Sequence, residues 1–258
     1  MRYIITIMAA IVVLASAPAF TQTLDPRTST IELSCSGTTP VVKPSFEDIS
    51  TGQCDSSVGG GSAFGLAEAY LSTPEVFVET YSSAYDTAVS AEAKSSIDIQ
   101  LKINSDAAPP VAIDTVPVFS FVYGEADFAG NSIGSASLTL TGPGYDDGSV
   151  LALAPPPVGG RITADIEPDQ VYSINIAASC FSVSATQGDV SHCIAVMDPY
   201  IFFDQAALNA LLGEDSFKLS DYYSIELSSI VPIPASWVLF ATALAWLGLV
   251  GRRGSKLL

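Results

Sequence analysis

Hydrophobic and polar residues alternate with a period of two over several segments of the chain, the pattern typical of β-strands with one buried face. In residues 96–104 every second position is Ile or Leu and the positions between them are polar. Residues 135–141 repeat this pattern, and residues 116–123 form a β-branched and aromatic run that fits a more buried strand. Further strands are predicted at residues 62–71, 75–81, 170–178, 180–184, 193–197 and 224–230.

Two segments have helical features. Asp204 is expected to cap a helix over residues 205–212, and Gly213 is expected to end it. Residues 82–94 are rich in Ala and are compatible with either a helix or an extended edge segment.

The strand pattern predicts one mainly β domain. In the strand segments near Cys180, the hydrophobic residues lie at even positions over residues 172–176 but at odd positions over residues 181–183. This change of face predicts a β-bulge near Cys180. Residues 155–160 are rich in Pro and Gly and are compatible with an interdomain linker. Each flank would then be a small half-sandwich, so we predict one antiparallel β-sandwich of jelly-roll type over residues 20–230.

The composition fits a packed, acidic domain. With 48% hydrophobic residues, 14% charged residues and a mean hydropathy of +0.40, the chain can offset its ordering entropy by burial. Most Phe side chains are expected in the core. The net charge is −17, and the segment from Phe20 to Val231 holds all 27 acidic residues. This charge favours solubility and argues against nucleic acid as a partner.

The chain contains four cysteines, which predict two disulfides if it is exported, as the N-terminal segment described next indicates. Proximity along the chain favours Cys35 with Cys54 and Cys180 with Cys193. A hairpin turning near Gly188 would place the second pair opposite each other. Two other connectivities remain formally open, and the spacing does not fit a zinc site.

The N-terminus resembles a secretory signal peptide. Arg2 is followed by an apolar run and by Ala17-Pro18-Ala19, a small-x-small cleavage pattern. We expect signal peptidase to remove residues 1–19, or residues 1–17 if the preceding site is used. An uncleaved anchor is the alternative.

The C-terminus resembles a membrane anchor. No charge occurs between Glu226 and Arg252, and residues 235–251 are almost wholly apolar. At about 1.5 Å per residue they span about 25 Å, the short end of a transmembrane helix. Arg252, Arg253 and Lys256 follow, and such cations favour the cytoplasmic side. We therefore predict a transmembrane helix with the body outside; a buried C-terminal helix of a soluble domain is the alternative.

A short motif precedes this predicted helix, namely Val231, Pro232, Ile233, Pro234 and Ala235. With the apolar helix and the basic pair Arg252 and Arg253, it resembles the sorting signal of the bacterial PEP-CTERM family in its VPxPA variant, without the Glu that the parent pattern has between the prolines. The resemblance covers residues 231–258 and implies processing by an exosortase-type membrane enzyme. It also implies a Gram-negative host and traffic linked to exopolysaccharide and biofilm assembly. The prolines keep the chain extended outside the membrane.

The sequence carries few signs of a catalytic site. The single histidine, His192, lies beside a predicted disulfide and follows no nucleophile motif, so we interpret it as structural. The chain contains no Walker A or dinucleotide-binding glycine motif. A glycosidase needs only two carboxylates, but nothing in the sequence selects a pair.

Calcium binding is a stronger alternative. Carboxylates gather on two predicted loops, and Ca²⁺ prefers clustered oxygen ligands. Neither loop matches an EF-hand. The weak candidate ligands are Asp146, Asp147, Asp165, Glu167 and Asp169.

We therefore expect a non-enzymatic exported protein without a required cofactor, which passes through the inner membrane to the cell surface or extracellular matrix. It would consist of a signal peptide (1–19), an ectodomain (20–230) and a sorting tail (231–258). A carbohydrate- or Ca²⁺-binding surface module is the alternative, with exposed Tyr and Phe as stacking groups, and a carboxylate glycosidase comes third.

Overall fold

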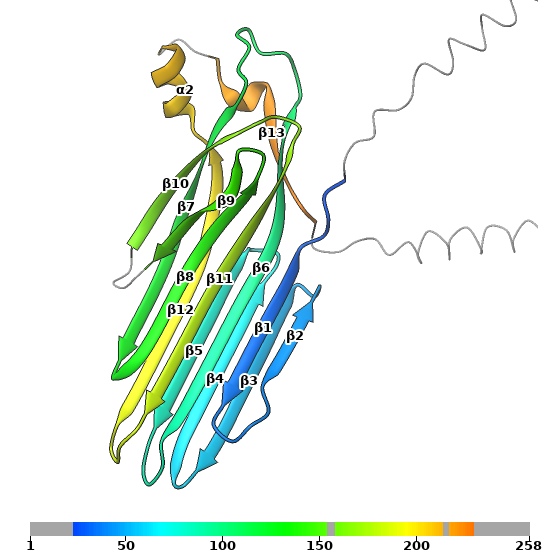
Figure 1. Cartoon of the computed structure of the whole chain (residues 1–258). Coiled ribbons are helices and arrows are strands. Elements are labelled where there is room, and N and C mark those ends of the chain that lie inside the picture. The colour runs from blue at the N-terminus through cyan, green and yellow to red at the C-terminus, as the bar shows by residue number, and fades with distance from the viewer. Residues whose placement is uncertain (1–22, 154–157, 214–216, 230–258) are drawn as a thin grey trace, which may run out of the picture.

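The computed structural model describes residues 23–153, 158–213 and 217–229, with only the backbone described for 121–128, 146–153 and 158–162. It shows two antiparallel sheets packed as a sandwich (Figure 1). In order, the seven-stranded sheet contains β2 (Val41–Ser45), β1 (Thr28–Cys35), β6 (Val89–Ser105), β11 (Val171–Ser184), β8 (Asn131–Gly142) and β9 (Tyr145–Leu153), with β13 (Tyr223–Leu227) paired to β6. The six-stranded sheet contains β10 (Val158–Ile166), β7 (Val116–Ala129), β12 (Val190–Phe203), β5 (Glu75–Ser83), β4 (Gly61–Tyr70) and β3 (Ile49–Val58). The predicted antiparallel β-sandwich is confirmed.

The long strand β6 organises the seven-stranded sheet. Along one edge it pairs with β1 through residues 91–98 and with β13 through residues 101–105, and along the other it pairs with β11. Its hydrophobic positions Ile97, Ile99, Leu101 and Ile103 are all buried, as the alternation predicts. Strand β6 therefore ties both ends of the described chain into one sheet.

The predicted bulge near Cys180 is wrong. Strand β11 pairs with β6 and β8 without a break in register, and its buried positions continue through Cys180 to Ser182 and Ser184. Phe181 instead faces outward and is 38% exposed. The small Ser side chains fit the narrow space between the sheets, whereas a phenyl ring there would overpack it.

The predicted helix is confirmed as α2 (Gln205–Leu212). The carboxylate of Asp204 accepts a hydrogen bond from the Ala207 backbone N–H at 3.0 Å, and Gly213 ends the helix with a φ of 100°. A short 3₁₀ helix, η1 (Leu219–Asp221), precedes β13. Residues 82–94 take the extended alternative, as the end of β5 and the start of β6.

Both predicted disulfides are confirmed, Cys35–Cys54 and Cys180–Cys193. Contrary to the prediction, Cys180 and Cys193 do not face each other across a β-hairpin, because β11 and β12 belong to different sheets. Cys35 and Cys54 also come from opposite sheets. The paired Cα atoms are 5.9 and 5.7 Å apart, whereas packed sheets usually lie about 10 Å apart. Each disulfide therefore joins the sheets where they approach closely.

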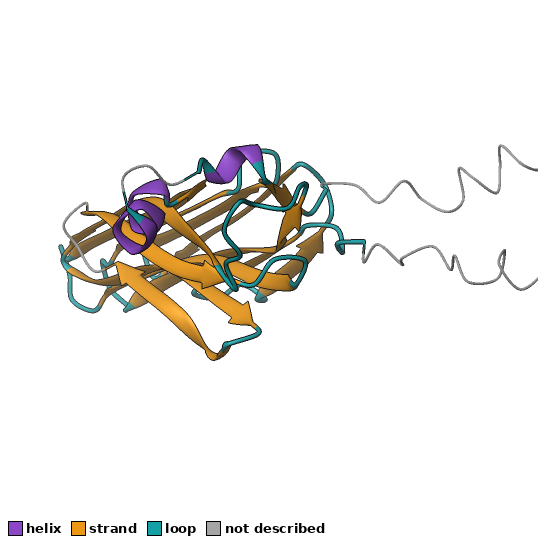
Figure 2. Cartoon of the chain, turned by 90° about the horizontal axis from the view of Figure 1, so that it is seen from above, coloured by secondary structure: helices purple, strands orange, loops and turns teal. Residues whose placement is uncertain are grey.

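The core differs between its two ends. At the helix end, where α2 and η1 lie (Figure 2), the buried residues are large, among them Leu71, Leu101, Ile103, Ile166, Tyr172, Leu208 and Leu219. At the loop end, where the β3–β4, β5–β6 and β11–β12 connections meet, they are small, among them Ala63, Ala91, Ala93, Thr80, Ser82, Ser182 and Ser184. No Phe with a described side chain is buried, so the expectation of a Phe-rich core was wrong.

Serine hydroxyls bridge the sheets within this narrow space. Ser95 of β6 donates a hydrogen bond to the carbonyl oxygen of Glu68 in β4 at 2.7 Å. Ser184 of β11 donates to the carbonyl oxygen of Ser82 in β5 at 2.9 Å. A Cβ added at Gly65 would lie 3.0 Å from the Cys54 sulfur, closer than most Cβ contacts, so the glycine leaves room for the disulfide. The loop end is held by disulfides, hydroxyls and close backbone approach.

The expected boundaries at residues 19/20 and 230/231 lie outside the described residues, as do the signal peptide, the sorting motif and the apolar tail. In the portion of the chain that the structure covers, no helix is long and apolar enough to cross a membrane.

Candidate functional site

The outer faces of the two sheets carry different side chains. The seven-stranded sheet presents mainly hydroxyl, amide and charged groups, among them Thr30, Glu32, Lys94, Ser96, Ser137, Thr139, Asn175 and Ser179. The six-stranded sheet presents aromatic and acidic groups on β4, β5 and β12, among them Phe64, Glu68, Tyr70, Glu75, Phe77, Tyr81, Asp198, Tyr200 and Phe202. Exposed aromatic rings are costly in water and often mark binding surfaces.

Five residues on this second face form an acidic–aromatic cluster: Glu68, Tyr70, Glu75, Asp198 and Tyr200. Tyr70 of β4 stands opposite Glu75 of β5. Strand β12 pairs with β5 so that Met197 stands opposite Val76, which places Asp198 beside Glu75. Tyr200 follows two residues later on the same face of β12. The strand register therefore joins residues from three strands into one patch.

Hydrogen bonds and charges couple the members of the cluster. Tyr70 donates from Oη to Glu68 Oε2 at 2.7 Å, and this bond, with burial and the charges of Glu68 and Glu75, raises the pKa of Tyr70 to about 12. Asp198 raises the pKa of Tyr200 through a hydrogen bond and through its charge. Burial raises the pKa of Glu75, and the carboxylates of Asp198 and Glu68 add to the shift. Both phenols stay protonated at neutral pH and remain hydrogen-bond donors.

The cluster is negatively charged. Within the described part of the chain, no Lys or Arg forms an ion pair with its three carboxylates. Among the described side chains of this face, His192 is a basic group, and its Nε2 lies 3.0 Å from Glu79 Oε1. This contact gives the His192 ring a hydrogen-bond partner on the neighbouring strand β5. The patch offers ring faces for stacking and carboxylate oxygens that accept hydrogen bonds from hydroxyl groups.

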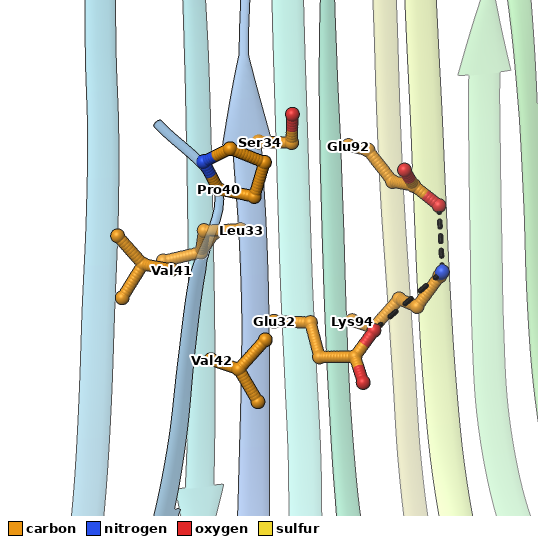
Figure 3. Close-up of a pocket in the computed structure, with 8 residues that line it drawn as sticks. All are labelled: Glu32, Leu33, Ser34, Pro40, Val41, Val42, Glu92 and Lys94. Carbon is orange, nitrogen blue, oxygen red and sulfur yellow. Dashed lines mark ion pairs between the residues drawn. The ribbon is translucent and has the colours of Figure 1, made fainter. Parts of the chain in front are cut away.

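On the opposite outer face, two shallow hollows of about 160 and 170 Å³ adjoin Lys94. Lys94 Nζ lies 2.8 Å from Glu92 Oε1 and 3.6 Å from Glu32 Oε2 (Figure 3). The hydrogen bond with Glu92 is the main cause of the raised pKa of Lys94. Because all three side chains are nearly half exposed, these ion pairs add little stability. Two carboxylates outnumber the single cation, so this site does not favour an anion.

The acidic loop residues predicted as calcium ligands are only partly described. Asp146 and Asp147 have no described side chains, whereas Asp165, Glu167 and Asp169 are exposed. The Asp169 carboxylate accepts a hydrogen bond from the Ser105 backbone N–H at 3.3 Å, so it contributes to the turn before β11. Among the described residues, no group of three or more His, Cys, Asp or Glu is arranged to hold a metal ion.

The sorting residues Val231, Pro232, Ile233, Pro234, Ala235, Arg252 and Arg253 lie outside the described residues. The sequence reasoning missed the acidic–aromatic cluster. Its signal is that acidic and aromatic residues occupy alternate positions within each strand, at residues 68–70, 75–81 and 198–202, opposite to the small or aliphatic core positions.

No family model matches the chain, and no curated protein matches it. Two solved structures show slight similarity. The enzymatically active domain of tailspike protein 4 from bacteriophage CBA120 is 11% identical, with a TM-score of 0.21 over 62% of this chain and 20% of that chain. The native α-L-rhamnosidase from Aspergillus terreus is 15% identical, with a TM-score of 0.11 over 80% of this chain and 26% of that chain. At these TM-scores neither similarity carries a conclusion about fold or function.

Proposed function

We propose that this chain is a non-enzymatic exported protein, sorted by an exosortase-type system to the cell surface or extracellular matrix and associated there with exopolysaccharide. The two disulfides between the sheets support export, because disulfides persist in oxidising compartments outside the cytoplasm. The motif Val231–Ala235 and the pair Arg252 and Arg253 support the sorting part.

We further infer that the sandwich is a jelly roll. Strands β5 to β12 lie in the order β5-β12-β7-β10 in one sheet and β6-β11-β8-β9 in the other. Eight consecutive strands in this order make two Greek keys, the arrangement of a jelly roll. Strands β1 to β4 then extend both sheets at one side.

The geometry of the carboxylates favours a non-enzymatic role. Glycoside hydrolysis needs carboxyl groups that flank the bond being broken. Glu68, Glu75 and Asp198 instead project from one face of one sheet. A substrate lying on that face would meet all three from the same side.

Peptide mapping of the mature protein from its native host tests the sorting proposal. Cells and medium are analysed separately by intact mass and by C-terminal peptides. We expect loss of the segment beyond the Val231–Ala235 motif, and a mature chain that ends at Leu258 would refute the proposal. Substitution of both Pro232 and Pro234 by Ala should reduce processing without preventing membrane insertion. The matched control is Ala substitution of Pro109 and Pro110, which lie on a surface loop of the ectodomain.

The second candidate function is a carbohydrate-binding surface module. It is favoured by one observation, the acidic–aromatic cluster on the outer face of the six-stranded sheet. A calcium-binding role remains a hypothesis that rests on the loop carboxylates in the sequence.

A further inference from the structure

The outer face of β12 carries two adjacent exposed aromatic rings. Tyr200 is 53% exposed and Phe202 is 49% exposed. Residues two apart on a strand are about 7 Å apart and point the same way. The ring of Phe202 also lies 5.5 Å from that of Phe119 on β7, at an interplanar angle of 32°. These rings form a small aromatic platform next to the acidic–aromatic cluster.

The charges near this platform restrict what can cover it. Glu75 and Asp198 lie side by side, and each raises the pKa of groups around it, so the surface has a negative potential. A second copy placed face to face would bring carboxylates against carboxylates, and an acidic polymer would also be repelled. A neutral partner avoids this cost. It must also offer apolar surface to the rings and hydroxyl donors to the carboxylates.

We propose that this face binds a neutral polysaccharide, with Tyr200 and Phe202 stacking on sugar rings and Glu75 and Asp198 accepting hydrogen bonds from sugar hydroxyls. Sugars combine C–H faces, which pack on aromatic rings, with hydroxyl groups, which pair with carboxylates. The inference deepens the proposed function, since it names the class of exopolysaccharide that the displayed sandwich would contact.

Native gel electrophoresis of the purified chain without its signal peptide, in neutral detergent, tests this proposal. Separate gels contain hydroxyethylcellulose, laminarin or dextran as neutral polymers, and alginate as an anionic one. We expect retarded migration in at least one neutral gel and none in alginate. Migration that is unchanged in all three neutral gels, or retarded only by alginate, would overturn the proposal.

Paired variants test the position of the site. The double substitution Tyr200→Ala and Phe202→Ala should weaken the retardation by about tenfold or more, since it removes two stacking contacts. The control is Ile133→Ala with Phe181→Ala, two exposed apolar residues that face each other on the other sheet; it should bind like the parent protein. If both double variants lost retardation equally, or if the Tyr200 and Phe202 variant lost none, the binding site would not lie on β12.

A third variant tests the charge argument. Glu75→Gln with Asp198→Asn keeps the side-chain sizes and removes two charges. We expect weaker binding of the neutral polymer and still no retardation in alginate, because most of the acidic residues remain. Unchanged binding of the neutral polymer contradicts the assigned carboxylate role. Gel filtration tests whether a second copy covers this face. A dimer in the parent protein that disappears in the Tyr200 and Phe202 variant would show that it does, and would overturn the proposal.

The binding test does not involve the C-terminal motif, so it can fail while the sorting proposal stands.

Discussion

At the helix end of the sandwich, Ile, Leu and Tyr side chains fill the space between the sheets, whereas at the loop end the sheets approach so closely that Ala, Ser and Cys fill it. The first end gains its stability mainly from apolar burial, about 25 cal/mol per Å². The second end buries little side-chain area. Covalent links and hydroxyl bridges hold it together, so one sandwich combines two kinds of core.

Reduction of both disulfides should give the largest effect. Their half-cystines are separated by 19 and 13 residues along the chain, and a loop of that size is worth about 3 kcal/mol per disulfide. Urea unfolding of the mature chain should therefore lose about 6 kcal/mol on addition of reductant. A variant with all four Cys changed to Ala is the control and should not respond to reductant. A loss below about 1 kcal/mol in the parent protein would show that other contacts hold the loop end.

Truncation of a large core residue should come second and should affect the helix end. Leu101 is buried on β6, so Leu101→Ala should lower the free energy of unfolding by about 3 kcal/mol. The milder Ile103→Val should cost about 1 kcal/mol. At the loop end, Ala93→Gly removes a single methyl group from the same strand and should also cost about 1 kcal/mol. If Ala93→Gly cost as much as Leu101→Ala, the two ends would not differ in the way described.

The sequence predicted the helix end better than the loop end. Large residues at every second position, as in Ile97 to Ile103, determine both the strand and its buried face. At the loop end, the buried residues Ser182, Ser184 and Ala93 are small, so they do not mark the buried face as large hydrophobic residues do. The bulky Phe181 therefore suggested that the opposite face of β11 is buried. The Phe181 ring is excluded by the short distance between the sheets. That distance depends on long-range packing, which the hydrophobic pattern of one strand does not predict.

The disulfides and the candidate site show the same limit. Proximity along the chain was sufficient to pair Cys180 with Cys193, but the sequence does not say whether consecutive strands are neighbours in one sheet or cross between sheets. The acidic–aromatic cluster depends on the register of three strands, of which β4 and β12 are far apart in sequence. Most Phe side chains were expected in the core, and the structure shows that Phe202 faces outward.

The smallest expected effect is the difference in unfolding free energy between Ala substitutions of two serines on the same face of β11. Ser184 and Ser182 are both fully buried, but Ser184 bonds to Ser82 across the sheets, whereas Ser182 Oγ forms no hydrogen bond with any described protein atom. Ser184→Ala should cost about 1 kcal/mol, because it removes a hydroxyl bridge and leaves the Ser82 groups without that partner. Ser182→Ala should be neutral or stabilise by up to about 1 kcal/mol, because a buried hydroxyl without a partner is unfavourable. Urea unfolding of both variants under oxidising conditions measures the difference. Equal costs would mean that Ser182 is also hydrogen-bonded, through a buried water, and that the whole loop end rests on paired hydroxyls.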